Sequence, residues 1–268
     1  MRDKGVYSAW YIGIPYLKVG GDTGIPICTR INIPYNIPTI YQYTTMTETL
    51  YIPQKYPERI MVHRSTFEDY LQILFGKPKA DKARTDYRLG GTVDRKTIFW
   101  QIDYLGHVRT GKVITYKPDG HRDKSINPGW VHTGLRRLKV LPSTFQVQQC
   151  LFGEHLLHDY PCKPVALVEA EKTAVICSLV YPSHVWVSVG GMDGLSAERC
   201  KALRCRDVTI FPDTDTEGKT FANWQLIAHK HLRHICHTLT VSDVLERFAD
   251  DTQKKDKIDI ADLLTLNL

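Results

Sequence analysis

The apolar residues of the chain follow two different patterns along its length. Apolar and polar positions alternate from Thr97 to His132, in TIFWQIDYLGHVRTGKVITYKPDGHRDKSINPGWVH, and this period of two predicts β-strands. Turns are expected at Tyr104-Leu105-Gly106 and at Pro118-Asp119-Gly120. We therefore expect an antiparallel meander in this part of the chain.

After Phe145, short apolar runs alternate with helical patterns. The expected helices cover residues 145–157, 172–180, 196–203 and 216–235, and the expected strands are PVALVE, VWVSVGG and DVTIFP. Strands separated by helices in this way predict a parallel sheet with helices on its faces. Ligands of such sheets bind beyond the carboxyl ends of the strands, so candidate chemistry is sought there.

The chain before Thr97 contains two further segments. Residues 1–60 are rich in Tyr, Pro and Gly, which favours short strands and turns, and we assign them no role. Ser65, with Glu68 three positions later, predicts the start of a short helix that Gly76 and Pro78 end. The predicted organisation is an α/β protein with an N-terminal segment (1–60), a smaller basic α+β subdomain (61–144) and a parallel-sheet domain (145–268).

Composition is that of an ordinary globular protein. The 268 residues are 43% hydrophobic and 24% charged. No apolar run reaches about eighteen residues, and the N-terminus has no signal-peptide pattern. We expect a cytoplasmic protein with no membrane partner.

A moderate positive charge favours a polyanionic partner without proving one. The formal net charge is +6 and the pI is near 8.8. Basic residues gather in and after the predicted meander, where they form either a solvated face or a phosphate-contacting surface. They are Arg109, Lys112, Lys117, Arg122, Lys124, Arg136, Arg137 and Lys139.

The cysteine and histidine residues do not predict a zinc site. The seven cysteines are scattered, mostly within apolar segments, which suits reduced thiols. Cys28 has no CxxC partner, so no N-terminal zinc ribbon is expected. The segment HKHLRHICH (229–237) lacks a second ligand pair and is better interpreted as a polar helix end.

Acidic residues and glycines follow the predicted parallel strands. Glu169 ends the first strand, and Asp213 and Asp215 follow the third. The two aspartates place like charges close together, and their repulsion is costly unless a cation lies between them. Oxygen ligands without His or Cys predict Mg²⁺ or Mn²⁺. Alternatively, Asp213 and Asp215 are only capping and first-turn acids of the next helix. The turn glycines at these ends are Gly190, Gly191 and Gly218.

These segments resemble the Toprim family in order and spacing. VALVEAEKTAVICS resembles the first Toprim motif, VSVGGMDGLS the small-residue turn after the second strand, and IFPDTDTEGKTFANW the DxD motif. The departure is Ala170, where the family most often has Gly. The resemblance implies a catalytic magnesium site built from Glu169, Asp213 and Asp215.

The upstream sequence is similar to bacterial and phage primases, closest to primase-like Toprim proteins of mobile elements. FQVQQCLFGEHLL resembles a helix that precedes the Toprim strand in primases, and the meander resembles the basic subdomain of the primase core. KKDKIDIADLL, with Lys257, Asp259 and Asp262, resembles a terminal motif whose acid assists the metal cluster, or it is a capped last helix. By this likeness the phosphate-binding residues are Arg109, Lys112, Arg122, Lys124 and Lys172.

The sequence leads to three hypotheses about function. The first is a primase-like nucleotidyltransferase that makes primers in the replication of a plasmid or mobile element, with single-stranded DNA, nucleotides and a replicative helicase as partners. The second is a metal-dependent nuclease that uses the same ions. The third is a catalytically silent nucleic-acid-binding module. A topoisomerase is disfavoured, because no tyrosine can be singled out as a nucleophile.

Overall fold

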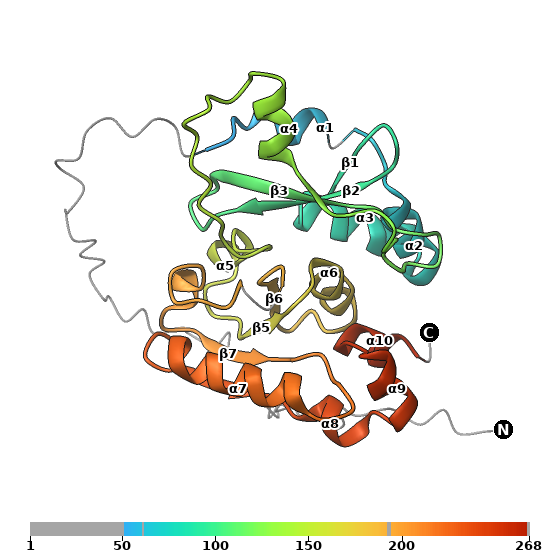
Figure 1. Ribbon diagram of the computed structural model, residues 1–268, viewed down its shortest axis with the longest axis vertical. Coiled ribbons are helices and arrows are strands. Elements are labelled where there is room, and N and C mark those ends of the chain that lie inside the picture. Colours follow the sequence, from blue (N-terminus) through green and yellow to red (C-terminus); the bar gives the residue numbers. More distant parts are fainter. Residues whose placement is uncertain (1–50, 61, 192–193, 267–268) are drawn as a thin grey trace, which may run out of the picture. The chain divides into compact units, whose positions relative to one another are not determined.

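The part of the chain that the structure describes contains one antiparallel and one parallel four-stranded sheet, and it is therefore mixed α/β (Figure 1). The computed structural model describes residues 51–60, 62–191 and 194–266, which belong to one compact unit. The predicted N-terminal segment lies outside the described residues up to position 50. The predicted domain boundaries stay predictions. None of the described helices has the length and apolar character needed to cross a membrane.

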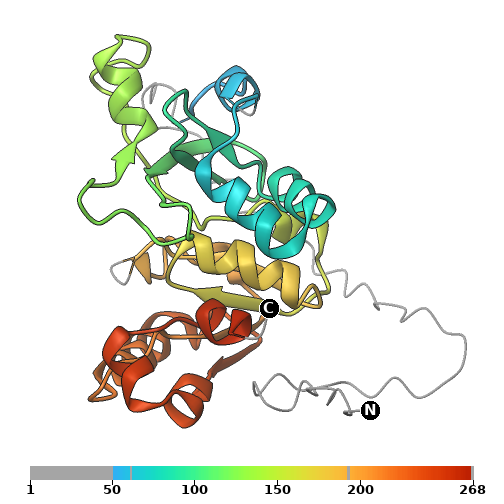
Figure 2. The ribbon, with the colours of Figure 1, turned by 90° about the vertical axis from the view of Figure 1, so that its right-hand side faces the viewer.

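The antiparallel sheet is the predicted meander, in the order β1-β2-β3-β4. Its strands are β1 (Gly90–Gly91), β2 (Thr97–Ile102), β3 (Val108–Ile114) and β4 (Gly129–Trp130). Both expected turns form, with Gly106 and Gly120 at positive φ. Figure 2 shows this sheet with the arm that β4 and the following helix make at its edge.

Four helices flank the antiparallel sheet: α1 (Lys55–Ile60), α2 (Thr66–Phe75), α3 (Lys77–Asp86) and α4 (Val131–Arg137). α2 begins with the predicted capping box, in which Ser65 and Glu68 each accept the other's backbone N–H. One face of the sheet buries Trp100 and Val108 in an apolar cluster with Ile52 and Leu135. Residues adjoining the undescribed N-terminal segment therefore contribute to the core.

The parallel sheet has the order β6-β5-β7-β8. Its strands are β5 (Val165–Val168), β6 (Val185–Ser188), β7 (Asp207–Ile210) and β8 (Thr238–Val241). The first three are predicted by the sequence, and all residues of β5 and β6 are buried, as expected for a parallel sheet with both faces covered. β8 was not predicted, because its four residues alternate between exposed and half-buried and lie at the sheet edge.

The connecting helices are shorter than the sequence suggested. They are α5 (Leu156–Asp159), α6 (Glu171–Val180), the 3₁₀ helix η3 (Lys201–Leu203), α7 (Lys219–Leu232), α8 (Val244–Phe248), α9 (Asp251–Asp256) and α10 (Ile260–Thr265). α6 matches its prediction. The helix expected from Ser196 is mostly turns, because Cys205 (φ 58°) already directs the chain into β7. α7 starts after Gly218, whose φ of 65° interrupts the helical pattern.

The helix predicted for residues 145–157 is wrong, apart from its last two residues. Phe152 instead pairs with β6, donating its N–H to Ser188 O (3.0 Å) and accepting the N–H of Ser188 (3.1 Å). Gly153 follows with φ 79°, and a Cβ there would lie 3.0 Å from Trp186 O. Pairing with the sheet edge satisfies these backbone groups and overrides the weak local helical pattern.

Several contacts join the two sheets and their flanking segments. Phe99 of β2 packs edge-on against Phe152 (5.4 Å between ring centroids). The Tyr87 hydroxyl donates to Trp186 O (2.9 Å). Lys112 of β3 forms an ion pair with Glu171 of α6. One face of the antiparallel sheet is thereby held against the parallel-sheet part, next to its strand ends.

Candidate active site at the switch point of the parallel sheet

The order of the parallel strands creates a switch point between β5 and β7. From β5 the chain crosses to β6 on one side, and from β7 it crosses to β8 on the other. Because such crossovers are right-handed, their helices α6 and α7 lie on opposite faces of the sheet (Figure 1). The carboxyl ends of β5 and β7 therefore border a crevice of the kind in which α/β sheets bind ligands. Glu169 follows β5 there, and Asp213 follows β7.

Asp213 is held among other acids. Burial raises its pKa well above the ordinary carboxyl range, and the charges of Asp259 and Glu169 raise it further. Lys172 opposes this shift with its positive charge. The switch point thus gathers several carboxylates, and both burial and their mutual repulsion favour the protonated form of Asp213.

The C-terminal segment brings Asp259 and Asp262 into this acidic cluster. The N–H of Thr214 donates to Ile258 O (3.2 Å), which ties the segment to the end of β7. Asp259 is 8% exposed, caps α10 and accepts a hydrogen bond from the Thr173 hydroxyl. Burial and the Asp262 charge raise the pKa of Asp259, while Lys172 lowers it.

Lys172 is the cation of the acidic cluster. Its ammonium lies 3.6 Å from Asp262 Oδ1, and its side chain is 17% exposed. Burial lowers its pKa, but the charges of Asp259 and Asp262 outweigh burial and the net direction is upward. The resemblance to primases implies that Lys172 binds a nucleotide; its observed partners are these carboxylates, which it partly neutralises.

Asp215 has a different environment from Asp213. Its carboxylate accepts the backbone N–H groups of Glu217 (2.8 Å), Lys219 (3.2 Å) and Thr220 (2.5 Å) at the start of α7. Hydrogen bonds from Thr220 and the neighbouring amides lower its pKa. Asp215 therefore orders the first turn of α7, which is the capping role that the sequence left open as an alternative.

Replacing Asp215 by Ala is expected to destabilise the protein by about 1–3 kcal/mol, because three backbone donors at the start of α7 lose their acceptor. Urea denaturation followed by circular dichroism measures this change. Asp243→Ala is a matched control, since Asp243 is half-exposed and pairs only with Arg247 on the surface. Equal stabilities of the two variants would contradict the capping role.

The glycines after β6 allow a close approach of Glu171 and Lys112. Gly190 has φ 74°, and a Cβ there would lie 2.9 Å from Glu171 Oε1. The Lys112 ammonium donates to Gly190 O (2.8 Å) and to Glu171 Oε2 (3.1 Å). Gly191 and Gly218 also have positive φ. These glycines shape the site edge, and Lys112 fixes the antiparallel sheet to it.

The predicted phosphate-binding residues fall into two groups. Lys112 and Arg109 are engaged inside the protein, since Arg109 pairs with Asp103 (2.8 Å) and lies over the Tyr51 ring. Arg122 and Lys124 are exposed on the loop between β3 and β4. Only this second group has the accessibility that contact with a polyanion requires.

The loop between β3 and β4 lies beside the acidic cluster. A Cβ on Gly120 would be 2.5 Å from the Tyr70 ring, so the loop turn packs directly on α2 at Tyr70. The pKa of Tyr70 is raised by burial, while the Lys172 charge lowers it and the Asp262 charge raises it. Tyr70 therefore lies between the loop that carries Arg122 and Lys124 and the acidic cluster.

The donor set fits a hard divalent ion at Glu169 and Asp213. Both side chains offer carboxylate oxygens, and a cation between them would offset the repulsion from Asp259 and Glu169 that, after burial, raises the pKa of Asp213. Asp215 fits less well, because its oxygens already accept backbone N–H groups. In the conformation that the described residues adopt, no three His, Cys, Asp or Glu side chains are arranged as a metal-binding group.

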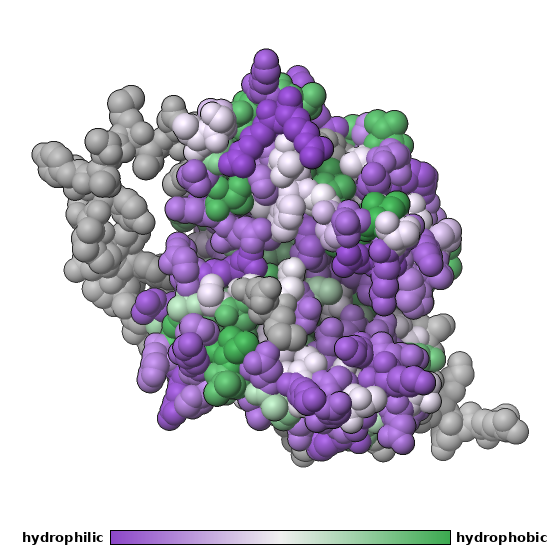
Figure 3. Space-filling model, viewed as in Figure 1, coloured by the Kyte–Doolittle hydropathy of each residue, from purple (hydrophilic) through white to green (hydrophobic). Residues whose placement is uncertain are grey.

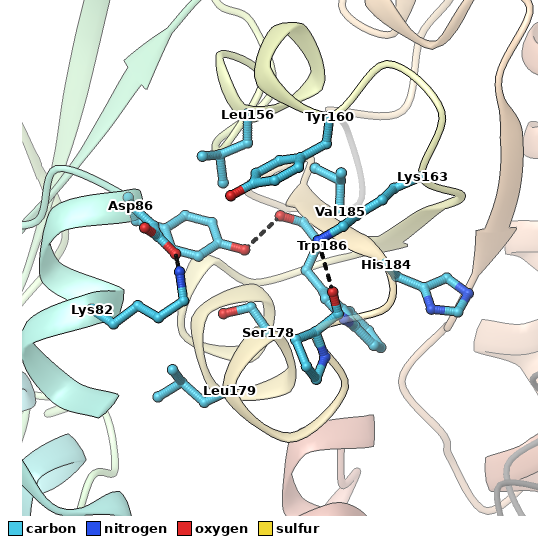
Figure 4. A pocket seen from close by; sticks show the side chains of 12 residues that line it. Lys82, Asp86, Leu156, Tyr160, Lys163, Ser178, Leu179, His184, Val185 and Trp186 are labelled. Carbon is cyan, nitrogen blue, oxygen red and sulfur yellow. Dashed lines mark hydrogen bonds and ion pairs between the residues drawn. The ribbon is translucent and has the colours of Figure 1, made fainter. Parts of the chain in front are cut away.

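A small pocket lies elsewhere, at the amino end of β6 (Figure 4). Its volume is about 70 Å³. Lys82 pairs with Asp86 at its edge, and Lys163 lies over the Tyr160 ring (4.1 Å). These charges are already satisfied.

The face of the molecule drawn in Figure 3 is mostly hydrophilic, with scattered apolar patches.

Two residues of the site region were missed or undervalued in the sequence. Glu171 is 1% exposed. In the sequence it lies between Ala170 and Lys172, a pattern that is typical of an exposed acid in the first turn of a helix. Asp259 gave a signal, the D-x-x-D capping pattern, but the same pattern fits an isolated last helix.

The free thiols expected from the sequence are found at Cys150, Cys162, Cys177, Cys200, Cys205 and Cys236.

Comparison with known proteins gives one family match. The sequence model of the family described as "Domain of unknown function (DUF6371)" matches residues 65–214, which include Glu169 and Asp213. No curated protein matches the chain.

Several solved structures are distantly similar. The primase fragment of the bacteriophage T7 primase-helicase has a TM-score of 0.40 and 15% identity, over 60% of this chain and 59% of that one. A DnaG primase catalytic domain bound to single-stranded DNA has a TM-score of 0.34 and 17% identity, over 59% and 49%. A DNA primase domain from Pseudomonas aeruginosa has a TM-score of 0.36 and 14% identity, over 68% and 59%. This chain spans less than two thirds of each.

Proposed function

The chain belongs to the DUF6371 family, and we propose that it is a Toprim-type, metal-dependent nucleotidyltransferase that synthesises primers on single-stranded nucleic acid. The observation that carries this proposal is the position of Glu169 and Asp213 after the carboxyl ends of neighbouring strands at the switch point, with a basic loop beside them. A nucleotidyltransferase needs both features, an anionic centre for cations and a cationic surface for phosphates.

Glu169 and Asp213 are the proposed metal ligands. A bound Mg²⁺ or Mn²⁺ would stabilise negative charge on the attacking and leaving oxygens of an in-line displacement. Asp259 and Asp262 add negative charge around Asp213, and Lys172 limits their repulsion in the absence of the ion. Asp215 holds the start of α7 in place, so that the loop carrying Asp213 keeps its position.

The exposed cations are proposed to hold the polyanionic substrate. Arg122 and Lys124 project from a loop that is fixed to α2 through Tyr70, so their backbone position relative to the acidic cluster is constrained. Phosphate contacts of this kind orient template and nucleotide without reading the bases. Lys112 and Arg109 do not contact the substrate in this proposal. They stabilise the antiparallel sheet that carries the loop, through their ion pairs with Glu171 and Asp103.

One assay tests the proposal directly. The full-length protein is incubated with single-stranded DNA, labelled nucleotides and Mg²⁺ or Mn²⁺, and the products are scored for both synthesis and cleavage. We expect metal-dependent incorporation that Glu169→Gln abolishes. Cleavage without incorporation, also lost in Glu169→Gln, would establish the nuclease instead. Binding without either activity would leave a catalytically silent module.

Changing Arg122 and Lys124 together to Ala is expected to weaken binding to single-stranded DNA of any sequence and to flatten its salt dependence. The slope of log K against log salt should fall by about 0.7 for each phosphate that the protein no longer neutralises. Fluorescence anisotropy at several salt concentrations measures it. Lys79→Ala with Lys201→Ala removes the same charge from exposed sites on α3 and η3 and is the control. Identical slopes in both double variants would contradict the assignment.

A further inference from the structure

Trp130 lies on the edge strand of the antiparallel sheet, directly opposite Lys112. The register of β3 and β4 pairs these two residues. Side chains of directly paired residues in antiparallel strands lie on the same face, with their Cβ atoms about 4.5–5.5 Å apart. The indole of Trp130 is therefore a neighbour of the Lys112 side chain.

That face of the antiparallel sheet is directed at the parallel strand ends. The Lys112 ammonium reaches Gly190 O (2.8 Å), in the turn that follows β6. Phe99, which pairs with Lys112 from the other side, packs against Phe152 on the parallel-sheet part. Trp130 is the outermost of these aligned positions, so it stands at the rim of the candidate site.

Trp130 differs from the other tryptophans that the structure describes. Trp100, Trp186 and Trp224 are at most 1% exposed and belong to the core. Trp130 is half-buried, so part of this residue is accessible to solvent. His132 lies beside it at 5.8 Å between ring centroids, and His132 Nδ1 is bonded to the Thr110 hydroxyl (2.7 Å). A hydrogen-bonded neighbour thus supports one side of the indole.

Exposed cations lie on both sides of Trp130 in the chain. Lys117, Arg122 and Lys124 precede it on the loop from β3, and Arg137 and Lys139 follow it on and after α4. An aromatic residue on a surface segment rich in exposed cations is the combination by which proteins bind single strands, since bases stack on the ring while cations follow the phosphates. Duplex nucleic acid, with its bases already stacked, does not offer a free base face.

We infer that Trp130 is a stacking platform for one base of a single-stranded nucleic acid, placing that strand at the rim formed by Lys112 and Gly190. The inference rests on the proposed function, because it specifies how the template is held. Stacking has no sequence requirement, since every base has a π-face. It also releases no counterions, so its contribution to affinity does not depend on salt.

The test uses oligothymidylate as the probe and the full-length protein carrying Trp10→Phe. This change removes the tryptophan that precedes the described residues. Among the tryptophans that the structure describes, Trp130 is then the one that is not buried in the core. Binding should quench the indole fluorescence. Trp130→Ala and Trp130→Leu should each weaken binding about tenfold, whereas Trp130→Phe should stay within about threefold of the parent. The salt slope should be unchanged in all three. Leu138→Ala removes another exposed apolar side chain from the same arm and should leave affinity unchanged.

The outcomes separate this inference from the proposed function. Salt-dependent binding that is equal in parent, Trp130→Ala and Trp130→Leu would overturn the stacking role and leave the nucleotidyltransferase proposal standing. No binding of oligothymidylate by the parent would overturn both. Equal weakening by Trp130→Phe and Trp130→Leu would also overturn stacking, because Phe retains a π-face and Leu does not. Melting curves of each variant confirm that the fold is retained.

Discussion

Replacing Asp213 by Asn is expected to reduce nucleotide incorporation by about a thousandfold or more and to raise the melting temperature of the metal-free protein at neutral pH. The loss of activity follows because a neutral amide is a poor ligand for the ions that stabilise charge in phosphoryl transfer. The gain in stability follows because Asn removes a half-buried carboxyl that Asp259 and Glu169 repel. Incorporation assays and thermal denaturation measure the two effects.

The pH dependence of stability gives a second measure of the effect of Asp213→Asn. A carboxyl whose pKa is raised by folding keeps its proton in the folded state over a pH range in which the unfolded chain has lost it. Stability of the metal-free protein should therefore fall as pH rises through this range, and the fall should be smaller in Asp213→Asn. Stabilisation by Mg²⁺ should grow with pH, because binding displaces the proton. Wild-type incorporation and an unchanged Mg²⁺ response in Asp213→Asn would contradict the site.

The parallel sheet could be predicted because local and global signals agree there. β5, β6 and β7 are short, apolar and followed by turn glycines or acids, and each contributes buried residues. The helix prediction for the segment around Phe152 was wrong because the backbone of Phe152 pairs with Ser188, which lies far along the chain. A pattern within one segment carries no information about a distant partner strand, so periodicity alone favoured a helix.

The candidate site could be located from the sequence, but the roles of its residues could not be separated. Asp213 and Asp215 are two positions apart and look equivalent in the sequence, yet Asp213 lies among carboxylates and Asp215 accepts the amides of α7. Likewise, Lys112 and Arg122 both appear as cations of a meander. Only the ion pair of Lys112 with Glu171 distinguishes the engaged lysine from the exposed arginine.

Replacing Lys112 by Met is expected to destabilise the protein by about 3 kcal/mol. The side chains of Lys112 and Glu171 are only 14% and 2% exposed, so the exchange leaves the Glu171 carboxylate buried without its ion-pair partner. Glu171 Oε1 already has no hydrogen-bond partner among the described residues, which makes removal of the donor to Oε2 more costly. Met keeps the length of the apolar side chain, so the change isolates the charge. Urea denaturation measures the free energy of unfolding.

A matched set of variants decides whether Lys112 acts in the interior or on the substrate. Lys124→Met, which removes an exposed lysine from the neighbouring loop, should change stability by no more than about 0.5 kcal/mol. Glu171→Gln in the Lys112→Met background should recover part of the missing stability, because a neutral amide tolerates burial better than an unpaired carboxylate. If Lys112→Met instead kept wild-type stability and reduced only the affinity for single-stranded DNA, the internal ion pair would be secondary. Lys112 would then belong with Arg122 and Lys124 on the phosphate-binding surface, as the sequence pattern suggests.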